Sequence, residues 1–121
     1  MLVAYICHQI SGDVSNNLMS IRAIVREINL TMPDTVPFVP YFADCRALDD
    51  SNISERRRGF KNNEYILRSG IVNALWLYGP RISAGMEEEM KIAVAMNIKI
   101  VAKSENINEN QINSIIRSWK V

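Results

Sequence analysis

The chain has 121 residues, of which 48% are hydrophobic, and this length suits a single domain, residues 1–121, with a substantial core. Its 14 basic and 13 acidic residues leave a net charge of +1, which argues against a nucleic-acid-binding surface as the main function. The apolar runs are shorter than the roughly 18 residues of a membrane-spanning helix, and no leader pattern opens the chain. We therefore expect a cytoplasmic protein without a membrane partner.

The two cysteines, Cys7 and Cys45, are far apart and do not have the spacing of metal ligands. We expect both to be free thiols in a reducing compartment. His8 is the single histidine, and there is no Cys/His cluster, so neither a metal site nor a cofactor is expected.

The first predicted element is a central strand, Leu2–Ile6, which is a short apolar run. It delivers the polar loop from residue 7 to residue 13 at its carboxyl end. Ser15 is placed to cap the next segment, which we predict to be an amphipathic helix from Asn16 to about Leu30. Its apolar residues recur at helical spacing: Leu18, Ile21, Val25 and Ile28.

A second strand is predicted over Thr35–Phe42, at the edge of the sheet, because Pro37 and Pro40 cannot donate to a ladder. From Ala43 to about Asn52 the pattern is lost, which indicates a polar loop. A charged helix then begins at Ile53 and continues to about Leu67. Long polar loops in small domains are often functional.

Two more strands are predicted, Ile71–Leu77 and Lys99–Ala102, with a helix over Met86–Asn97 between them. A last helix, Ile112–Trp119, has apolar residues at i, i+3, i+4 and i+7. Strands that alternate with helices predict a three-layer α/β sandwich. Its sheet is parallel, flavodoxin- or Rossmann-like, with four to five strands and helices on both faces.

In such a sheet, ligands bind beyond the carboxyl ends of the strands. Three polar loops are expected to converge there: residues 7–13, 41–52 and 78–85. The third loop contains Gly79, Ser83 and Gly85 and opens into a helix. Backbone N–H groups and the positive end of a helix dipole favour a phosphate at such a junction.

Glu89 is the one carboxylate inside the apolar arc of the predicted Met86–Asn97 helix, where it falls between Met96 and Ala93. A carboxylate on a core-facing stripe is costly unless it has a partner or faces a cleft. Glu89 is therefore a candidate for a perturbed, working acid. The alternative is that it lies at the rim of the stripe and favours the helix start electrostatically.

Several other residues have two interpretations. The basic cluster Arg56–Arg58 is either a solvated helix face or a contact for a phosphate or a neighbouring subunit. His8 either contacts a ligand or bonds to backbone, and the turn of Ser11, Gly12 and Asp13 either cradles an anion or is an ordinary turn.

Asp49 and Asp50 either begin a helix or take a ligand or interface role. Trp76 and Trp119 are predicted to be core residues. The methionines of the central helix are also predicted to pack in the core: Met86, Met90 and Met96.

Three segments resemble the nucleoside 2-deoxyribosyltransferase-like superfamily, in particular its small phage and bacterial members. They are A-Y-I-C-H-Q-I-S-G-D, L-D-D-S-N-I-S-E-R-R-R-G and A-L-W-L-Y-G-P-R-I-S-A-G-M-E-E-E-M-K-I-A. The similarity extends from Tyr5 to about Val101. Its most specific motif is a glycine, a glutamate four residues later and a small residue four further on, which here are Gly85, Glu89 and Ala93.

The resemblance implies that Glu89 attacks or stabilises the anomeric carbon while an N-glycosidic bond breaks, with Tyr5 beside the sugar. Ser83 matches the serine that holds the phosphate in 2'-deoxynucleoside 5'-monophosphate N-glycosidases. The resemblance also implies a homo-oligomer, a dimer or larger, with pockets near the interface. If the protein is phage-encoded, it would work in the host cytoplasm.

Two positions depart from the pattern of this superfamily. The resemblance implies that an aspartate before the third strand assists at the base or the sugar, and here this catalytic position holds Asn73, which cannot carry charge or take a proton. The position two residues after the glutamate, which is often glycine in this superfamily, holds Lys91. Two functions therefore remain open. One is cleavage or transfer at the N-glycosidic bond of a nucleoside or nucleotide, and the other is a catalytically silent binder that sequesters a nucleotide-derived immune signal.

Overall fold

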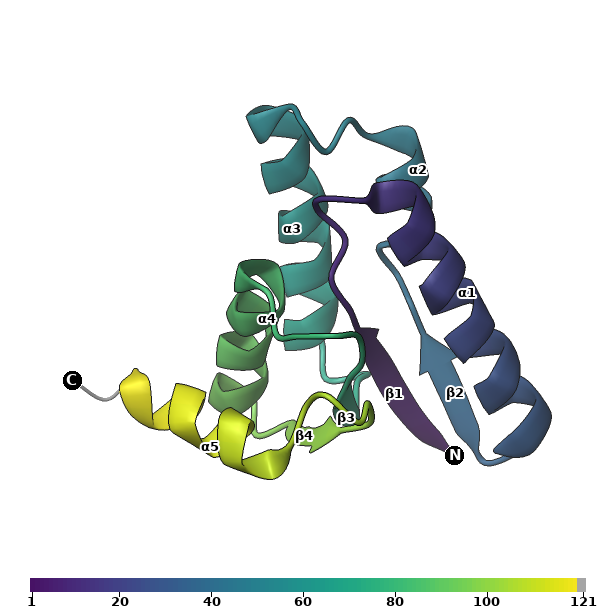
Figure 1. Cartoon of the computed structure of the whole chain (residues 1–121), viewed down its shortest axis with the longest axis vertical. Helices are drawn as coiled ribbons and strands as arrows, with labels where there is room; N and C mark the ends of the chain where they lie inside the picture. The colour runs from purple at the N-terminus through teal and green to yellow at the C-terminus, as the bar shows by residue number, and fades with distance from the viewer. Residues whose placement is uncertain (120–121) are drawn as a thin grey trace.

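The computed structural model describes residues 1–119, and within them the chain forms one parallel four-stranded sheet (Figure 1). The strands are β1 (Leu2–Cys7), β2 (Thr35–Phe38), β3 (Ala74–Leu77) and β4 (Lys99–Ala102). Their order is β2-β1-β3-β4, so that Tyr5 of β1 lies opposite Phe38 on one side and Leu75 on the other. The predictions of a central first strand and an edge second strand are confirmed.

The helices of the described chain cover both faces of this sheet, which confirms the three-layer Rossmann-like α/β fold (Figure 1). They are α1 (Val14–Thr31), α2 (Phe42–Ala47), α3 (Ile53–Arg68), α4 (Ala84–Ala95) and α5 (Glu109–Ser118). No helix within residues 1–119 is long and apolar enough to cross a membrane.

Alternate residues of the strands feed two apolar clusters, because successive side chains of a strand point to opposite faces. On one face, Ala4 and Ile6 of β1 pack with Ile28 of α1. On the other face, Tyr5 packs with residues of α3 and α4, including Leu67 and Met90. Tyr5 and Glu89 therefore share the face that α3 and α4 cover.

The start of α1 and the segment after β2 differ from prediction. Asp13, not Ser15, caps α1, and its side chain accepts a hydrogen bond from the Asn16 N–H at 3.3 Å. Part of the predicted loop 43–52 is the helix α2. Six residues are too few to show helical periodicity, and Phe42 and Cys45 hold α2 against the core.

The strands β2 and β3 are shorter than predicted. β2 ends at Phe38, before Pro40, and the chain turns there so that the buried Tyr41 hydroxyl donates to the carbonyl of Ile6. β3 begins at Ala74 and not at Ile71, which is exposed.

The end of α4 also differs from prediction. Met96 was predicted to pack in the core, but the helix ends at Ala95 and Met96 is 36% exposed. Asn97 follows with a positive φ of 57°, a conformation typical of a residue that ends a helix. Met86 and Met90 are buried, as is Trp76, which confirms those three predictions, whereas Trp119 is only partly buried.

Candidate functional site

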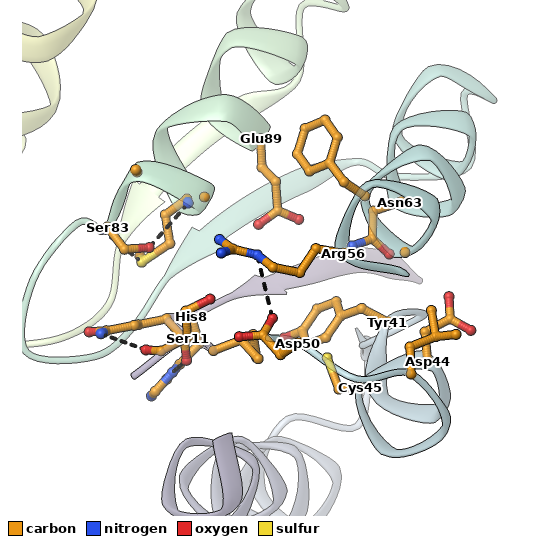
Figure 2. A pocket seen from close by; sticks show the side chains of 18 of the residues that line it. His8, Ser11, Tyr41, Asp44, Cys45, Asp50, Arg56, Asn63, Ser83 and Glu89 are labelled. Atoms are coloured by element: carbon orange, nitrogen blue, oxygen red, sulfur yellow. Dashed lines mark hydrogen bonds and ion pairs between the residues drawn. The ribbon is translucent and has the colours of Figure 1, made fainter. Parts of the chain in front are cut away.

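A cavity of about 440 Å³ opens at the carboxyl ends of the central strands (Figure 2). Its lining comes from residues between 8 and 12, between 41 and 63, and between 81 and 89. The three loops expected to converge do so, and α3 and the first turns of α4 complete the walls. The volume lies within the range of small-molecule sites, about 300–1,000 Å³.

Glu89 forms the floor of this cavity and points inward from the second turn of α4 (Figure 2). Its side chain is buried, with 8% of the residue exposed. The Tyr5 hydroxyl donates to its Oε2, and the Cys7 thiol donates to its Oε1 at 3.6 Å. Burial raises the pKa of Glu89 from its ordinary 4.5 to about 7, although the two hydrogen bonds act in the opposite direction. The carboxyl group is therefore poised between its two protonation states near neutral pH.

Three buried groups near Glu89 remain protonated. Tyr5, Cys7 and Tyr41 are buried, and burial raises the pKa of each well above its ordinary value, with the nearby Glu89 carboxylate adding to the effect. The Tyr5 and Tyr41 rings pack with their centres 5.7 Å apart. Tyr5 is not in the cavity lining. It acts on the site through its hydrogen bond to the Glu89 carboxyl group.

The amino end of α4 forms one wall, with Ser83 as its cap. The Ser83 hydroxyl oxygen accepts a hydrogen bond from the Met86 N–H at 3.2 Å, which leaves the hydroxyl proton to donate to a ligand. Gly85 lies in the first turn, and a Cβ added there would meet no atom within 4 Å. The backbone at this helix start is thus accessible from the cavity, as an anion site requires.

The loop after β1 forms a second wall and is fixed by His8. One ring nitrogen of His8 bonds to the carbonyl of Gln9 at 2.7 Å, and the other bonds to the Ser20 hydroxyl at 3.1 Å. Gly79 lies beside the ring, and its φ of +106° favours glycine, although an added Cβ would meet the ring at an ordinary contact distance of 3.5 Å. Because both ring nitrogens are engaged, His8 anchors the loop that presents Ser11 and Gly12 to the cavity.

Besides Tyr5, three predicted site residues are not in the lining. Gly79 lies beside the His8 ring, and Asp13 caps α1. The prediction that Asn73 belongs to the site is wrong. Asn73 is exposed at the amino end of β3, where its Oδ1 accepts a hydrogen bond from the Val3 N–H at 2.7 Å. A residue directly before a parallel strand lies at the edge of the sheet opposite the cavity, so Asn73 is not part of the site.

The third wall, formed by α2, α3 and the loop between them, was only partly predicted. Asp50 lines it as expected and pairs with Arg56, with 3.7 Å between Oδ1 and Nε. Asp44 is held by the Asn62 amide at 2.9 Å. The Oδ1 atom of Asn63 is buried and has no hydrogen-bond partner among residues 1–119.

A signal for this wall was present in the sequence. Arg56–Arg58 stood out as the basic cluster, but only Arg56 of the three lines the cavity. Which arginine does so depends on the rotation of α3, about 100° per residue. Within residues 1–119, no group of three or more His, Cys, Asp or Glu side chains is arranged to hold a metal ion.

Comparison with known proteins gives one family. Residues 2–103 match a family described as a domain of unknown function, DUF7768. No curated protein and no solved structure gives a significant match. Because the match spans most of the 121 residues and includes all four strands and the cavity, the chain belongs to the DUF7768 family.

Proposed function

We propose that the protein binds a nucleoside or nucleotide in this cavity and cleaves or transfers at its N-glycosidic bond. A (deoxy)nucleoside 5'-monophosphate is the ligand that we favour. The observation that carries the proposal is the buried Glu89 carboxyl group, with a pKa raised to about 7, at the floor of a cavity that also exposes a helix amino end. The resemblance of the three sequence segments supports the same chemistry.

In the proposed reaction, the bond between the anomeric carbon and the base nitrogen breaks, and its electron pair leaves with the base. Positive charge develops at the anomeric carbon, where the ionised Glu89 stabilises it or forms a bond to it. Water or an acceptor then takes the sugar. Tyr5 is a positioning residue, because its hydroxyl holds one carboxylate oxygen.

The two ends of the ligand find different surroundings. The phosphate would lie at the amino end of α4, beside Ser83 and Gly85. The base would then face the wall of α2 and α3, and a water molecule admitted there would deliver the proton that the leaving base requires.

The test is to incubate the protein with a panel of deoxynucleoside and ribonucleoside 5'-monophosphates, together with the free nucleosides, and to follow base release by chromatography. We expect Glu89→Gln to reduce base release by about a thousandfold or more, since it removes the reacting carboxylate. Glu88→Gln is the matched control, because Glu88 is exposed on the same helix. No base release across the panel by folded protein would contradict the enzymatic proposal.

A second function, sequestration without cleavage, is favoured by the hydrogen bonds of Glu89. Both of its carboxylate oxygens already accept bonds from buried donors, Tyr5 and Cys7, and these bonds make the carboxylate a weaker nucleophile. Such a cavity would hold a nucleotide-derived immune signal intact. Ligand recovered after heat denaturation should then be unchanged. If it is hydrolysed, and Glu89→Ala leaves it whole, the binder function fails.

We also propose that the protein works in the cytoplasm as a homo-oligomer with its cavities near the interface. The support is the resemblance, since proteins of that superfamily complete their pockets with a neighbour's loop. Light scattering coupled to gel filtration measures the oligomeric state directly. A monomer at the concentration of the activity assay would contradict this part of the proposal.

A further inference from the structure

The Arg56 side chain extends from α3 across the cavity toward the start of α4, where Ser83 lies (Figure 2). It forms an ion pair with Asp50, whose Oδ1 lies 3.7 Å from the Arg56 Nε. The pair is loose: the Arg56 side chain is 55% exposed and the Asp50 side chain is 31% exposed. Half-exposed ion pairs of this length contribute little to stability, so Arg56 can change partners at low cost.

The charges around the cavity make Arg56 important to an anionic ligand. Among the described lining residues there are two arginines and five carboxyl groups: Arg56, Arg81, Asp44, Asp49, Asp50, Glu55 and Glu89. Arg81 is exposed, and its Nε contacts the Gln9 side chain at 3.4 Å. An anion in the cavity is therefore opposed by several carboxylates, and Arg56 is the cation directed across the cavity toward the helix amino end.

We propose that Arg56 is an anion-binding residue that exchanges Asp50 for the phosphate of the ligand, and that Asp50 sets the affinity by competing for it. In the bound state the phosphate lies between the Arg56 guanidinium and the Ser83 hydroxyl. The guanidinium has five N–H donors in a planar fork, which suits a phosphate better than a single distant carboxylate oxygen. This inference rests on the proposed function for the identity of the ligand, but not for the exchange itself.

The experiment compares the affinities of a deoxynucleoside 5'-monophosphate and its nucleoside in four proteins. Relative to the wild type, Arg56→Gln should weaken binding of the monophosphate about ten- to a hundredfold and leave the nucleoside within about twofold. Asp50→Asn should strengthen binding of the monophosphate by about fivefold, because the competing charge is gone. Arg57→Gln is the matched control: Arg57 is the exposed neighbour outside the lining and should change neither affinity.

The exchange is overturned if Arg56→Gln affects the two ligands equally or not at all, or if Asp50→Asn weakens the monophosphate. A separate titration with inorganic phosphate, followed by the NMR signal of the Arg56 Nε–H group, tests the exchange without a nucleotide. If no nucleotide binds but phosphate shifts this signal and Asp50→Asn increases the phosphate affinity, the proposed function fails and the exchange holds. If phosphate leaves the signal unchanged, the exchange fails.

Discussion

The floor of the cavity, where Glu89 meets Tyr5 and Cys7, is buried between the sheet and α4, whereas the wall formed by α2, α3 and their connecting loop is largely exposed. On the floor, both carboxylate oxygens have a donor whose own pKa is raised by burial. On the wall, the polar contacts are a long ion pair and single hydrogen bonds between exposed or part-buried groups. The difference indicates that the floor is preorganised and that the wall is adaptable.

The largest expected effect on the floor is the pH dependence of stability. Glu89 has a folded-state pKa of about 7 against 4.5 in the unfolded chain, so between these values the native state retains a proton that the unfolded state loses. The contribution of Glu89 to the free energy of unfolding is fully present below about pH 4.5. It falls by about 3 kcal/mol as the pH rises through about 7. Glu89→Gln should abolish this loss and be more stable than the wild type at pH 8.

Denaturant unfolding at pH 4.5, 6 and 8 measures this dependence. Glu88→Gln should retain the wild-type profile, because Glu88 is exposed. If the free energy of unfolding of Glu89→Gln falls with pH as steeply as that of the wild type, another group is responsible.

Tyr5→Phe has the next largest effect and separates positioning from packing. The ring remains against Tyr41, but a buried carboxylate oxygen loses its donor, which should cost about 1–3 kcal/mol at pH 8. The pKa of Glu89 should rise further, because the hydrogen bond from Tyr5 lowers it. The titration of Glu89, followed by carbon NMR of its carboxyl group, measures the shift.

Tyr41→Phe is the control for Tyr5→Phe. The Tyr41 hydroxyl donates to the carbonyl of Ile6, so its loss should destabilise the protein to a similar extent without removing a donor from Glu89. Equal shifts of the Glu89 titration in both variants would contradict a specific role for Tyr5.

Much of the floor could be predicted from sequence, and much of the wall could not. Glu89 was identifiable because α4 is long enough to show which of its residues faces inward, and because the carboxyl ends of parallel strands meet at one edge. Asn73 was assigned to the site by the resemblance, but it directly precedes β3. The four residues of β3 span about 13 Å, so Asn73 lies at the opposite end of the strand from the cavity.

The position of α2 in the wall depends on tertiary contacts that have no local signal. The helix α2 has six residues, so its position follows from the packing of Phe42 and Cys45 rather than from periodicity. Met96 was misassigned for a related reason. The predicted helix ran to Asn97 and so included Met96 in its apolar stripe, but the helix ends at Ala95 and Asn97 adopts a positive φ.

A smaller effect is expected on the wall, where the Asn62 amide of α3 holds Asp44 of α2 at 2.9 Å. Asn62→Ala should reduce stability by only about 0.5–1.5 kcal/mol, because both groups are part-buried and water can replace the bond. It should also speed amide hydrogen exchange in α2 without affecting β1. Exchange that accelerates equally in β1 would show that the wall and the floor open together and do not differ in rigidity.

The smallest effect is expected at Gly59, in the interior of α3 and in the cavity lining. Glycine in a helix interior is less stable than alanine by about 0.5–1 kcal/mol, and a Cβ here would lie 3.6 Å from the Leu48 Cδ1, an ordinary contact. Gly59→Ala should therefore raise the free energy of unfolding by about 0.5–1 kcal/mol, measured with urea. If it also weakens binding of a nucleoside 5'-monophosphate, the glycine serves the ligand at some cost in stability, as expected of a wall that adapts. If the variant is destabilised instead, α2 and α3 are packed more tightly than an adaptable wall allows. The wall would then be as rigid as the floor.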